Sequence, residues 1–447
     1  MNGTLKRHGV LLLAGLLLGA AIAHADTGLP APIEEVIRRE VHAGLAVHVG
    51  CKDGNLTTAL RVSDGFLVHG LATDNEAAER ARDYVRSQGL YGPVSVAHWG
   101  GGGLPYADGT VNLLVVDGAA VPRAEMERVL GPKGVACVRE GDGWRKIVAP
   151  WPKEIDEWTH FFHGPDNNAV AQDSLVGPPK GVQWVCGPRW SRSHENDRSV
   201  IAMVSAAGRV IYLVDRGPTG FAEKSGVPGK WFLEARDAFS GVRLWQIPTD
   251  AWPDMGIWGR THVSRRLVAH GDTVYVTMGG DSPVTEVDCR AGEILRRLEG
   301  TEGAAGLRCL DDRLIVVKPQ GSLPKWGADS PRPMDVMAFD VESGRRLWAV
   351  TVPYLRLTTT AAKAGRIYYF GGDSVHFRFG PAEIVELRHR PDAALPVDAA
   401  DKAVEGVDRK KFVHAPGGVA FPLAAYGQRH GGPGKLTGEG DDGLGID

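Results

Sequence analysis

The sequence has few cysteines, no zinc-ligand motif and no excess of charge of one sign. Its 447 residues include five cysteines, too few and odd in number for a fold held together by disulfides. No Cys-x-x-Cys or His-Glu-x-x-His motif occurs, and no residues have the spacing of zinc ligands. The 51 basic and 54 acidic residues nearly balance, whereas nucleic acids and anionic membranes require a clustered basic face. Neither is therefore expected as a partner.

Long apolar runs are confined to the beginning of the chain. The charged Lys6-Arg7-His8 precedes an apolar run over residues 10–22, which ends at the small-residue motif Ala23-His24-Ala25. This order of charge, apolar run and cleavage motif predicts a signal peptide over residues 1–25 and an exported protein, periplasmic or extracellular. The run is shorter than the roughly 20 residues that span a bilayer, and no later segment is apolar enough, so no transmembrane span is expected.

The most informative feature is an internal repeat with a period of about 50 residues. Three segments share a small or apolar residue, an aspartate, a small residue with glycine, and a leucine; they are ARDAFSGVRLW, VDCRAGEILRR and AFDVESGRRLW. Their aspartates are Asp237, Asp288 and Asp340. Aspartate followed by glycine supplies a tight turn, so each segment is predicted to be a β-hairpin. The period fits one four-stranded propeller blade per unit.

A second strand pattern precedes these hairpins and carries a family resemblance. It occurs four times, as GRVIYLV, GDTVYVT, DRLIVVK and GRIYYF, which implies at least three blades and part of a fourth. Together with the hairpins it resembles the pyrroloquinoline-quinone-type (PQQ-like) propeller repeat over Trp151 to Phe370. The resemblance implies that Trp245 and Trp348 pack between neighbouring blades. Arg297 stands at the tryptophan position of the second unit, where the blade contact is in question.

Residues 30–148 have another pattern, in which strands alternate with helices as in a parallel α/β sheet. The phrases VGCKDG, LPYADGTVNLLVVD and RVLGPKGVACV follow in this order. They resemble the glycine loop, cofactor-lining strand and final strand of class I S-adenosylmethionine methyltransferases. The fold class predicted for the whole chain is therefore multidomain: a Rossmann-like, methyltransferase-like α/β domain, followed over residues 151–375 by an all-β, partial PQQ-like propeller.

The same resemblance names candidate cofactor-binding residues and shows where the loop departs from its family. Gly50 and Gly54 remain from a glycine loop that lets the backbone approach the cofactor. Lys52 replaces the middle glycine, and His48 stands at the acidic position. The acid that binds the ribose hydroxyls in the family has only Asp74, two residues late, as a substitute. The loop is therefore expected to bind the cofactor poorly, and the domain to serve in packing or partner binding.

The junction between the two domains is rich in aromatic and polar residues. The stretch resembles the first strand of PQQ-like propellers, whose pattern W-x-x-[FY]-x-x-[DN]-x-x-[NR] we map onto Trp158, Phe161 or Phe162, Asp166 and Asn168. Trp158, His160, Asp166 and Asn168 are candidate ligand-binding residues. On a strand His160 and His163 would point to opposite faces, which argues against a shared metal ion. The alternative is that the polar side chains satisfy backbone groups of turns and strand ends.

The end of the chain lacks the repeat. A closed ring needs some 300 to 400 residues at this period, whereas residues 151–375 hold about 220, so an incomplete ring is expected. Residues 376–447 are rich in Gly, Pro, Asp and Lys, which predicts an irregular or disordered tail. A truncated or frame-shifted gene would give this pattern, and so would a flexible tail.

The sequence thus predicts an exported binding or scaffold module without a cofactor, with a protein or small molecule as its unidentified partner. Two enzymatic alternatives stay open: a PQQ-dependent dehydrogenase with calcium, and an S-adenosylmethionine-dependent methyltransferase. No adjacent cysteines occur of the kind that often lie over PQQ in the dehydrogenases. An assembly propeller with an exposed apolar patch is a third class. An open row of blades is also expected to self-associate through its exposed face.

Overall fold

The structure is a computed structural model that describes residues 28–175, 177, 181–187, 199–217, 229–250, 252, 260–321, 332–363, 365–371 and 383–388. The predicted signal peptide lies outside these residues. No helix within them is long and apolar enough to cross a membrane. Residues 30–148 and the sheets that follow belong to one compact unit.

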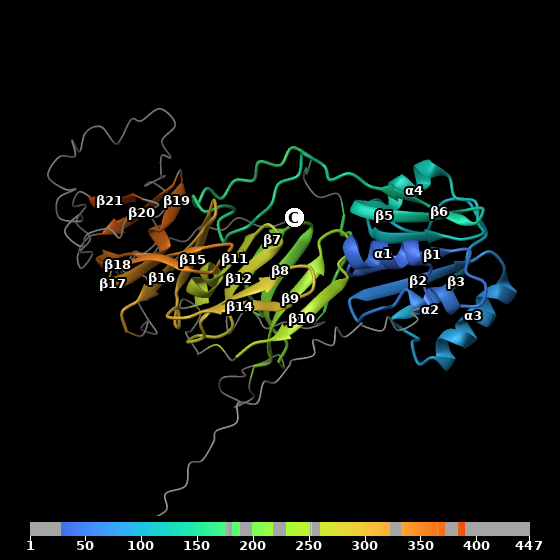
Figure 1. Cartoon of the computed structure of the whole chain (residues 1–447), viewed down its shortest axis with the longest axis horizontal. Helices are drawn as coiled ribbons and strands as arrows, with labels where there is room; N and C mark the ends of the chain where they lie inside the picture. Colours follow the sequence, from blue (N-terminus) through green and yellow to red (C-terminus); the bar gives the residue numbers. More distant parts are fainter. Residues whose placement is uncertain are drawn as a thin grey trace, which may run out of the picture. The chain divides into compact units, whose positions relative to one another are not determined.

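Residues 30–148 form a six-stranded sheet (Figure 1). Its strands are β1 (Gly44–Val49), β2 (Phe66–Ala72), β3 (Val94–His98), β4 (Val111–Val116), β5 (Leu130–Glu140) and β6 (Gly143–Val148). The order is β3-β2-β1-β4-β5-β6, parallel throughout except for the terminal β5–β6 hairpin. The strand order reverses between β1 and β4, which defines a doubly wound, Rossmann-like sheet. The predicted fold class of this domain is confirmed.

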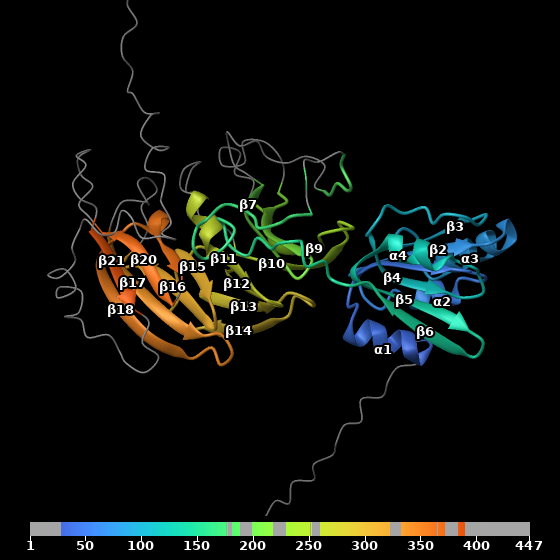
Figure 2. The same cartoon turned by 90° about the horizontal axis from the view of Figure 1, so that it is seen from above.

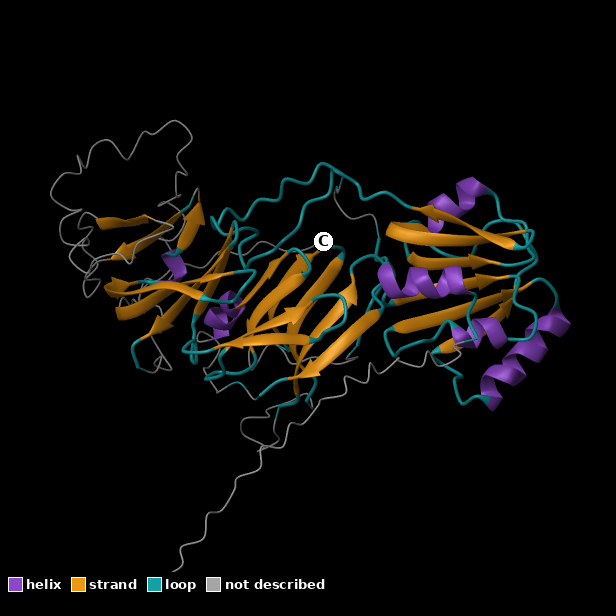
Figure 3. Cartoon of the chain, viewed as in Figure 1, coloured by secondary structure: helices purple, strands orange, loops and turns teal. Residues whose placement is uncertain are grey.

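Four helices cover the sheet. They are α1 (Ala31–Arg39), α2 (Asn55–Ala59), α3 (Asn75–Ser87) and α4 (Arg123–Val129). Ile33 of α1 and Ala81 of α3 are fully buried in one core against the sheet, whereas Met126 of α4 is buried in a second core. The sheet strands carry long Val and Leu runs because both of their faces are covered. The result is three layers, which Figure 3 distinguishes by element type.

The rest of the described chain is built from antiparallel sheets in which consecutive strands pair (Figure 2). The first sheet holds β7 (Val200–Ala206), β8 (Arg209–Asp215), β9 (Trp231–Asp237) and β10 (Arg243–Pro248). The second follows the 3₁₀ helix η1 (Arg260–Arg266) and holds β11 (Leu267–His270), β12 (Thr273–Thr277), β13 (Val284–Asp288) and β14 (Ile294–Leu298). The third holds β15 (Gly306–Leu310), β16 (Arg313–Pro319), β17 (Arg332–Asp340) and β18 (Arg346–Leu355). The fourth follows η2 (Leu357–Thr359) and holds β19 (Ala361–Lys363), β20 (Arg366–Gly371) and β21 (Glu383–Arg388).

Within the described residues the second half of the chain forms several sheets that do not close into a barrel or a ring, and their arrangement as a partial propeller stays a prediction. The structure corrects one prediction: β21 lies in the segment 376–447, for which an irregular tail was predicted. The regular structure therefore extends beyond the expected boundary at residue 375. The sequence missed β21 because it stands outside the repeated hairpin pattern.

The three predicted hairpins are confirmed. Each aspartate accepts a backbone N–H from within its own turn: Asp237 from Ser240, Asp288 from Arg290 and Asp340 from Ser343. The glycine four residues later has a positive φ in every turn, at 71° in Gly241, 74° in Gly292 and 69° in Gly344. Only glycine adopts this conformation without strain, so the Asp-to-Gly spacing determines the turn.

Trp245 of β10 joins the first sheet to the second, as predicted. Its indole covers the next hairpin so closely that a Cβ on Gly292 would lie 2.7 Å from the indole Cγ. The indole N–H donates to the carbonyl oxygen of Cys289 at 2.8 Å, within the same hairpin. One side chain thus buries a large apolar surface and satisfies its own polar group.

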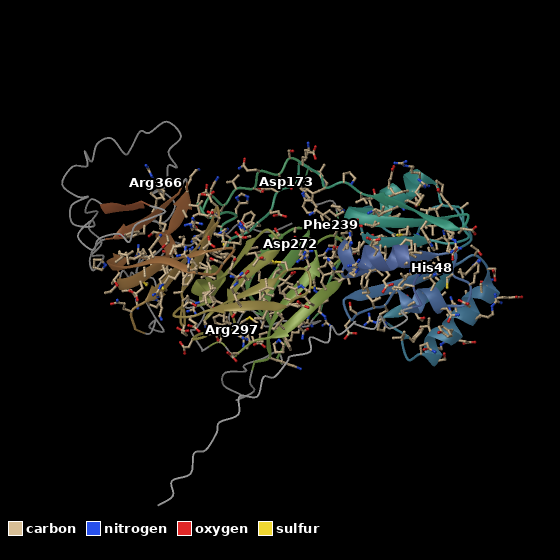
Figure 4. The ribbon with its side chains drawn as sticks, viewed as in Figure 1. His48, Asp173, Phe239, Asp272, Arg297 and Arg366 are labelled. Atoms are coloured by element: carbon tan, nitrogen blue, oxygen red, sulfur yellow. The ribbon has the colours of Figure 1, made fainter. Side chains whose placement is uncertain are left out.

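In the second sheet an arginine makes this contact, but it is Arg296 and not Arg297, the residue that was aligned with the tryptophan position. Arg296 stands eight residues after Asp288, as Trp245 stands eight after Asp237. Its Nη1 would lie 2.6 Å from a Cβ on Gly344 of the third sheet, and its Nη2 donates to the carbonyl oxygen of Glu342. Arg297 is exposed instead (Figure 4). The alignment was one residue off because no tryptophan marks the position.

Replacing Trp245 by alanine is expected to lower the free energy of unfolding of the sheet region by about 3–5 kcal/mol, because it empties a buried inter-sheet contact. Arg297→Ala, on the exposed neighbouring position, is the control and should stay within about 0.5 kcal/mol of wild type. Denaturant unfolding measures both. Equal effects of the two substitutions would show that Trp245 does not join the sheets.

Candidate functional site

The loops after β1 and β4 form the carboxyl edge of the sheet at the point where the strand order reverses, the usual ligand position in this fold. Gly50 follows β1 with φ 93°, and a Cβ there would lie 1.9 Å from the carbonyl oxygen of Asp117 after β4. Gly54 precedes α2 with φ 88°, and its Cβ would lie 3.0 Å from the carbonyl oxygen of Ala81. Both candidate glycines are thus required by the fold itself.

His48, at the position of the family's acid, is buried and 4% exposed (Figure 4). Its Nδ1 lies 2.8 Å from the Thr57 hydroxyl, which donates to Sγ of Cys51 at 3.1 Å. Since that hydroxyl proton is used, Nδ1 donates to Oγ1 and Nε2 is left as a bare acceptor, without a partner among the described residues. Burial lowers the pKa of His48 to about 4, so the ring is neutral at pH 7.

The two other positions that depart from the family pattern are also engaged within the protein. Nζ of Lys52 would lie 3.5 Å from a Cβ on Gly118, so this side chain reaches from the β1 loop to the β4 loop. The carboxylate of Asp74 accepts the Ala77 N–H at 2.7 Å and caps α3. Such a cap contributes typically about 1 kcal/mol to a helix. The edge therefore brings Gly50 and Gly54 together, while Asp74 serves the helix beside them.

The second candidate site is the junction segment of residues 156–168, which we call the strap. It makes a hydrogen bond to the first strand of each of the four antiparallel sheets in turn. The backbone of Trp158 exchanges two bonds with Ser205 of β7, and the carbonyl of Thr159 accepts the Ala269 N–H of β11. The strap then bonds to Cys309 of β15 through His160 and to Ala362 of β19 through the carbonyl of Pro165. Each of these strands is an edge of its sheet, so the strap satisfies groups that an edge leaves open.

His160 is the buried centre of the strap. Its Nε2 accepts the Cys309 N–H at 2.9 Å, and its Nδ1 lies 2.8 Å from the Thr159 hydroxyl. Burial, followed by the positive charge of Arg308, holds the pKa of His160 well below its usual value. A protonated Nε2 could no longer accept the Cys309 bond. The imidazole is thus a neutral structural acceptor at this position.

The other three candidate residues of the strap, Trp158, Asp166 and Asn168, make separate contacts. The Trp158 indole donates to the carbonyl of Phe161 at 3.2 Å. Asp166 accepts the Asn168 N–H at 3.1 Å and lies 3.3 Å from Nζ of Lys363, while Asn168 itself is exposed. The four candidates therefore do not converge on one ligand position.

His163 has another partner than His160: its Nε2 lies within hydrogen-bond distance, 2.6 Å, of Oδ2 of Asp156. The two histidines are joined only by a backbone bond across a turn, at whose end His163 has φ 64°. Over the described ranges no three or more His, Cys, Asp or Glu side chains gather in a way that could hold a metal ion. The strap histidines thus belong to two separate contacts.

Sequence reasoning missed the buried arginines next to the strap. Arg308 of β15 donates to Asn167 Oδ1 at 3.1 Å and to the carbonyl of Thr360 at 2.9 Å. Burial and the nearby charge of Arg265 lower its pKa to about 9. Arg265 in turn lies over the rings of Phe161 and Phe162, 5.2 and 5.1 Å from their centroids. No local motif marks Arg308, because its partners are 52 and 141 residues away.

Comparisons with known proteins bear on the α/β domain. No protein-family model matches the chain, and no curated protein matches it significantly. Among solved structures it is similar to a putative S-adenosylmethionine-dependent methyltransferase from Methanococcus maripaludis, at 21% identity and a TM-score of 0.22, covering 24% of this chain and 52% of that one. Geranyl diphosphate C-methyltransferase from Streptomyces coelicolor gives 18%, 0.22, 24% and 44% for the same quantities.

The chain spans about half the length of these neighbours, or less. A putative sarcosine dimethylglycine methyltransferase from Galdieria sulphuraria, at 21% identity and a TM-score of 0.21, is covered over 42% of its length. The Rossmann-like assignment of this domain comes from the chain itself, through the strand order and the glycine geometry described above.

The strap should make the stability of the sheet region depend on pH. Unfolded His160 titrates near pH 6.5, whereas its pKa in the folded protein is well below this value, so below pH 6.5 the unfolded state binds more protons. The free energy of unfolding should therefore fall with decreasing pH, by up to about 1.4 kcal/mol per pH unit from this group. Thermal melts at pH 7.5 and pH 5 measure the difference.

His160→Gln keeps an acceptor for the Cys309 N–H but cannot titrate, so its pH dependence should be shallower than that of wild type. His48→Gln serves as a control, because His48 titrates with the same sign in the α/β domain. The melting of the sheet region should keep its full pH dependence in that control. An unchanged slope in His160→Gln would refute the assignment.

Proposed function

We propose that the chain is an exported binding scaffold whose sheets are blades of an incomplete PQQ-like propeller and whose α/β domain no longer binds S-adenosylmethionine. The blade assignment is supported by the repeated Asp-to-Gly hairpin, by the Trp245 contact between sheets and by the neighbouring edge strands that the strap connects. Its partner is a protein or a small molecule. Export rests on the predicted signal peptide over residues 1–25.

One observation carries the proposal: the protein's own side chains occupy the positions that would recognise the cofactor. In the family that the loop resembles, an acid lies near the amino-acid end of the cofactor and another binds the ribose. Here the first position holds His48, which is neutral and bonded to Thr57, and the nearest acid to the second, Asp74, caps α3. Lys52 adds a cationic side chain across the loop, where the family has a glycine.

The size of the effect follows from the lost charge-assisted hydrogen bonds. A hydrogen bond to a charged group contributes roughly 1.5–3 kcal/mol. Losing two of them weakens binding by about 3–6 kcal/mol, or roughly 10²- to 10⁴-fold. A cofactor that methyltransferases would hold with a dissociation constant of about 1 μM would then bind with one of roughly 0.1 to 10 mM.

A methyltransferase is the second candidate, and specific observations favour it. The strand order reverses at the expected place, and Gly50 and Gly54 keep the backbone geometry of a close approach. The bare Nε2 of His48 is an acceptor that a hydrogen-bond donor could use. This candidate requires that the cofactor be recognised without the two acids.

A PQQ-dependent dehydrogenase is supported less well. Its calcium requires a cluster of oxygen ligands, and the part of the chain that the structure describes brings no acidic cluster together. Arg308 is buried and engaged with Asn167 and Thr360. The described residues therefore do not fit this cofactor, and we derive no reaction step through it.

Isothermal titration calorimetry of the purified chain with S-adenosylmethionine tests the proposal. We expect a dissociation constant of about 0.1 mM or weaker, because the two charged contacts are missing. A dye-reduction assay with added PQQ and calcium should likewise show no oxidation of alcohols or sugars. Micromolar binding in the first experiment would favour the methyltransferase, and robust oxidation in the second would favour the dehydrogenase.

A further inference from the structure

A short segment, residues 181–187, contacts the hairpin of the first sheet in the same way that β10 contacts the hairpin of the second sheet. A Cβ on Gly241 would lie 2.5 Å from Cδ2 of Trp184, and the Trp184 indole N–H donates to the carbonyl of Ala238 at 3.0 Å. Ala238 and Gly241 stand one and four residues after Asp237, as Cys289 and Gly292 stand after Asp288. Trp184 therefore makes the same contact with the first hairpin that Trp245 makes with the second.

The two tryptophans differ in what surrounds them. Trp245 belongs to an outer strand, β10, that pairs with β9. Residues 181–187 pair with no strand of the described chain, although Trp184 makes the contact that a tryptophan of an outer strand makes. Val182 and Val185 are 81% and 86% exposed, unusual values for β-branched residues. The segment thus has the hairpin contact of an outer strand but no partner strand among the described residues.

The fourth sheet, in contrast, has no outer strand among the described residues. Each of the first three sheets has four strands, and its outer strand is the last one: β10, β14 and β18. The fourth sheet ends at β21, its third strand, and no described strand lies on the free side of β21. Within the described residues, the chain thus offers one segment with the contact of an outer strand, and it leaves one side of β21 without a paired strand.

These two features lie at opposite ends of the row of sheets. The first strands of the sheets are neighbours in chain order, β7 with β11, β11 with β15 and β15 with β19, and the strap follows the same order. β7 and β19 are not neighbours among the described elements that pack closely together. The segment at the first sheet is therefore far along the row from the side of β21 that has no paired strand among the described residues.

We propose that residues 181–187 of one copy complete the fourth sheet of a second copy beside β21, and that two copies joined in this way at both ends form a closed ring of eight sheets. The inference rests on the blade assignment proposed above. Head-to-tail contacts close into a ring when their rotation permits, and eight blades are within the range of known propellers. Each contact adds backbone hydrogen bonds and buries Val182 and Val185, as in strand addition to a sheet edge.

Cys186 provides a direct probe of the proposed contact. It lies within residues 181–187, which we call the docking strand, and it is exposed, whereas the other four cysteines are buried. A maleimide should therefore label Cys186 selectively in the native protein. If the strand docks on a second copy, the labelling rate should fall at least severalfold as the protein concentration rises from about 1 to 100 μM. The mass from light scattering should rise over the same range from one copy to two.

The double substitution Val182→Asp and Val185→Asp places charge on the docking strand, and it should raise the dimer dissociation constant at least tenfold. Val170→Asp is the matched control, because Val170 is 59% exposed and lies outside the strap and the docking strand. All these sites are exposed, so the melting temperatures should remain unchanged and folding is separated from association.

Three results would overturn the inference. A monomer at all concentrations with constant Cys186 labelling refutes docking, and a monomer with Cys186 protected at every concentration means that the strand docks within its own chain. Assemblies larger than two copies refute the two-copy ring. Calorimetry with S-adenosylmethionine on the same sample reports separately on the proposed function, so the two failures can be distinguished.

Discussion

The hydrogen bonds between the strap and the sheet edges are the constraint on which the second half of the structure depends. Each of the four antiparallel sheets presents a first strand whose outward N–H and C=O groups are not hydrogen-bonded to another strand. Residues 156–168 supply a partner for each of these edges, using backbone groups for three of them and the His160 ring for the fourth. The tryptophan and arginine contacts then join the outer ends of the same sheets. A single short segment thus links four sheets spread over more than 150 residues.

The sequence predicted what depends on neighbouring residues. Asp237, Asp288 and Asp340 form hairpins because aspartate and glycine determine the turn locally. The partners of the strap were not predictable, since His160 and Cys309 are 149 residues apart and no local pattern connects them. Arg296 was missed for a related reason: its role is defined by the glycine it covers in another sheet.

In the α/β domain, some residues of the β1 loop are required by the fold, and others bear on cofactor binding. Gly50 would be needed even without a ligand, because a side chain there would collide with the backbone after β4. His48 and Lys52, in contrast, are compatible with the fold and unfavourable for the cofactor of the family that the loop resembles. A glycine motif alone therefore predicted the fold correctly and left the activity open. Lys52 between the glycines and His48 before them bear on the activity instead.

The account's central claim is that the strap and the four sheet edges form one cooperative unit. Hydrogen exchange of the amides of Ser205, Ala269, Cys309 and Ala362 tests it most directly, because each of them donates to the strap. Groups that open together share one opening free energy. In His160→Ala, which removes the acceptor of the Cys309 amide and leaves the acceptors of the other three amides in place, we expect all four amides to lose protection by a similar factor. Faster exchange at Cys309 alone, with the other three unchanged, would contradict the account.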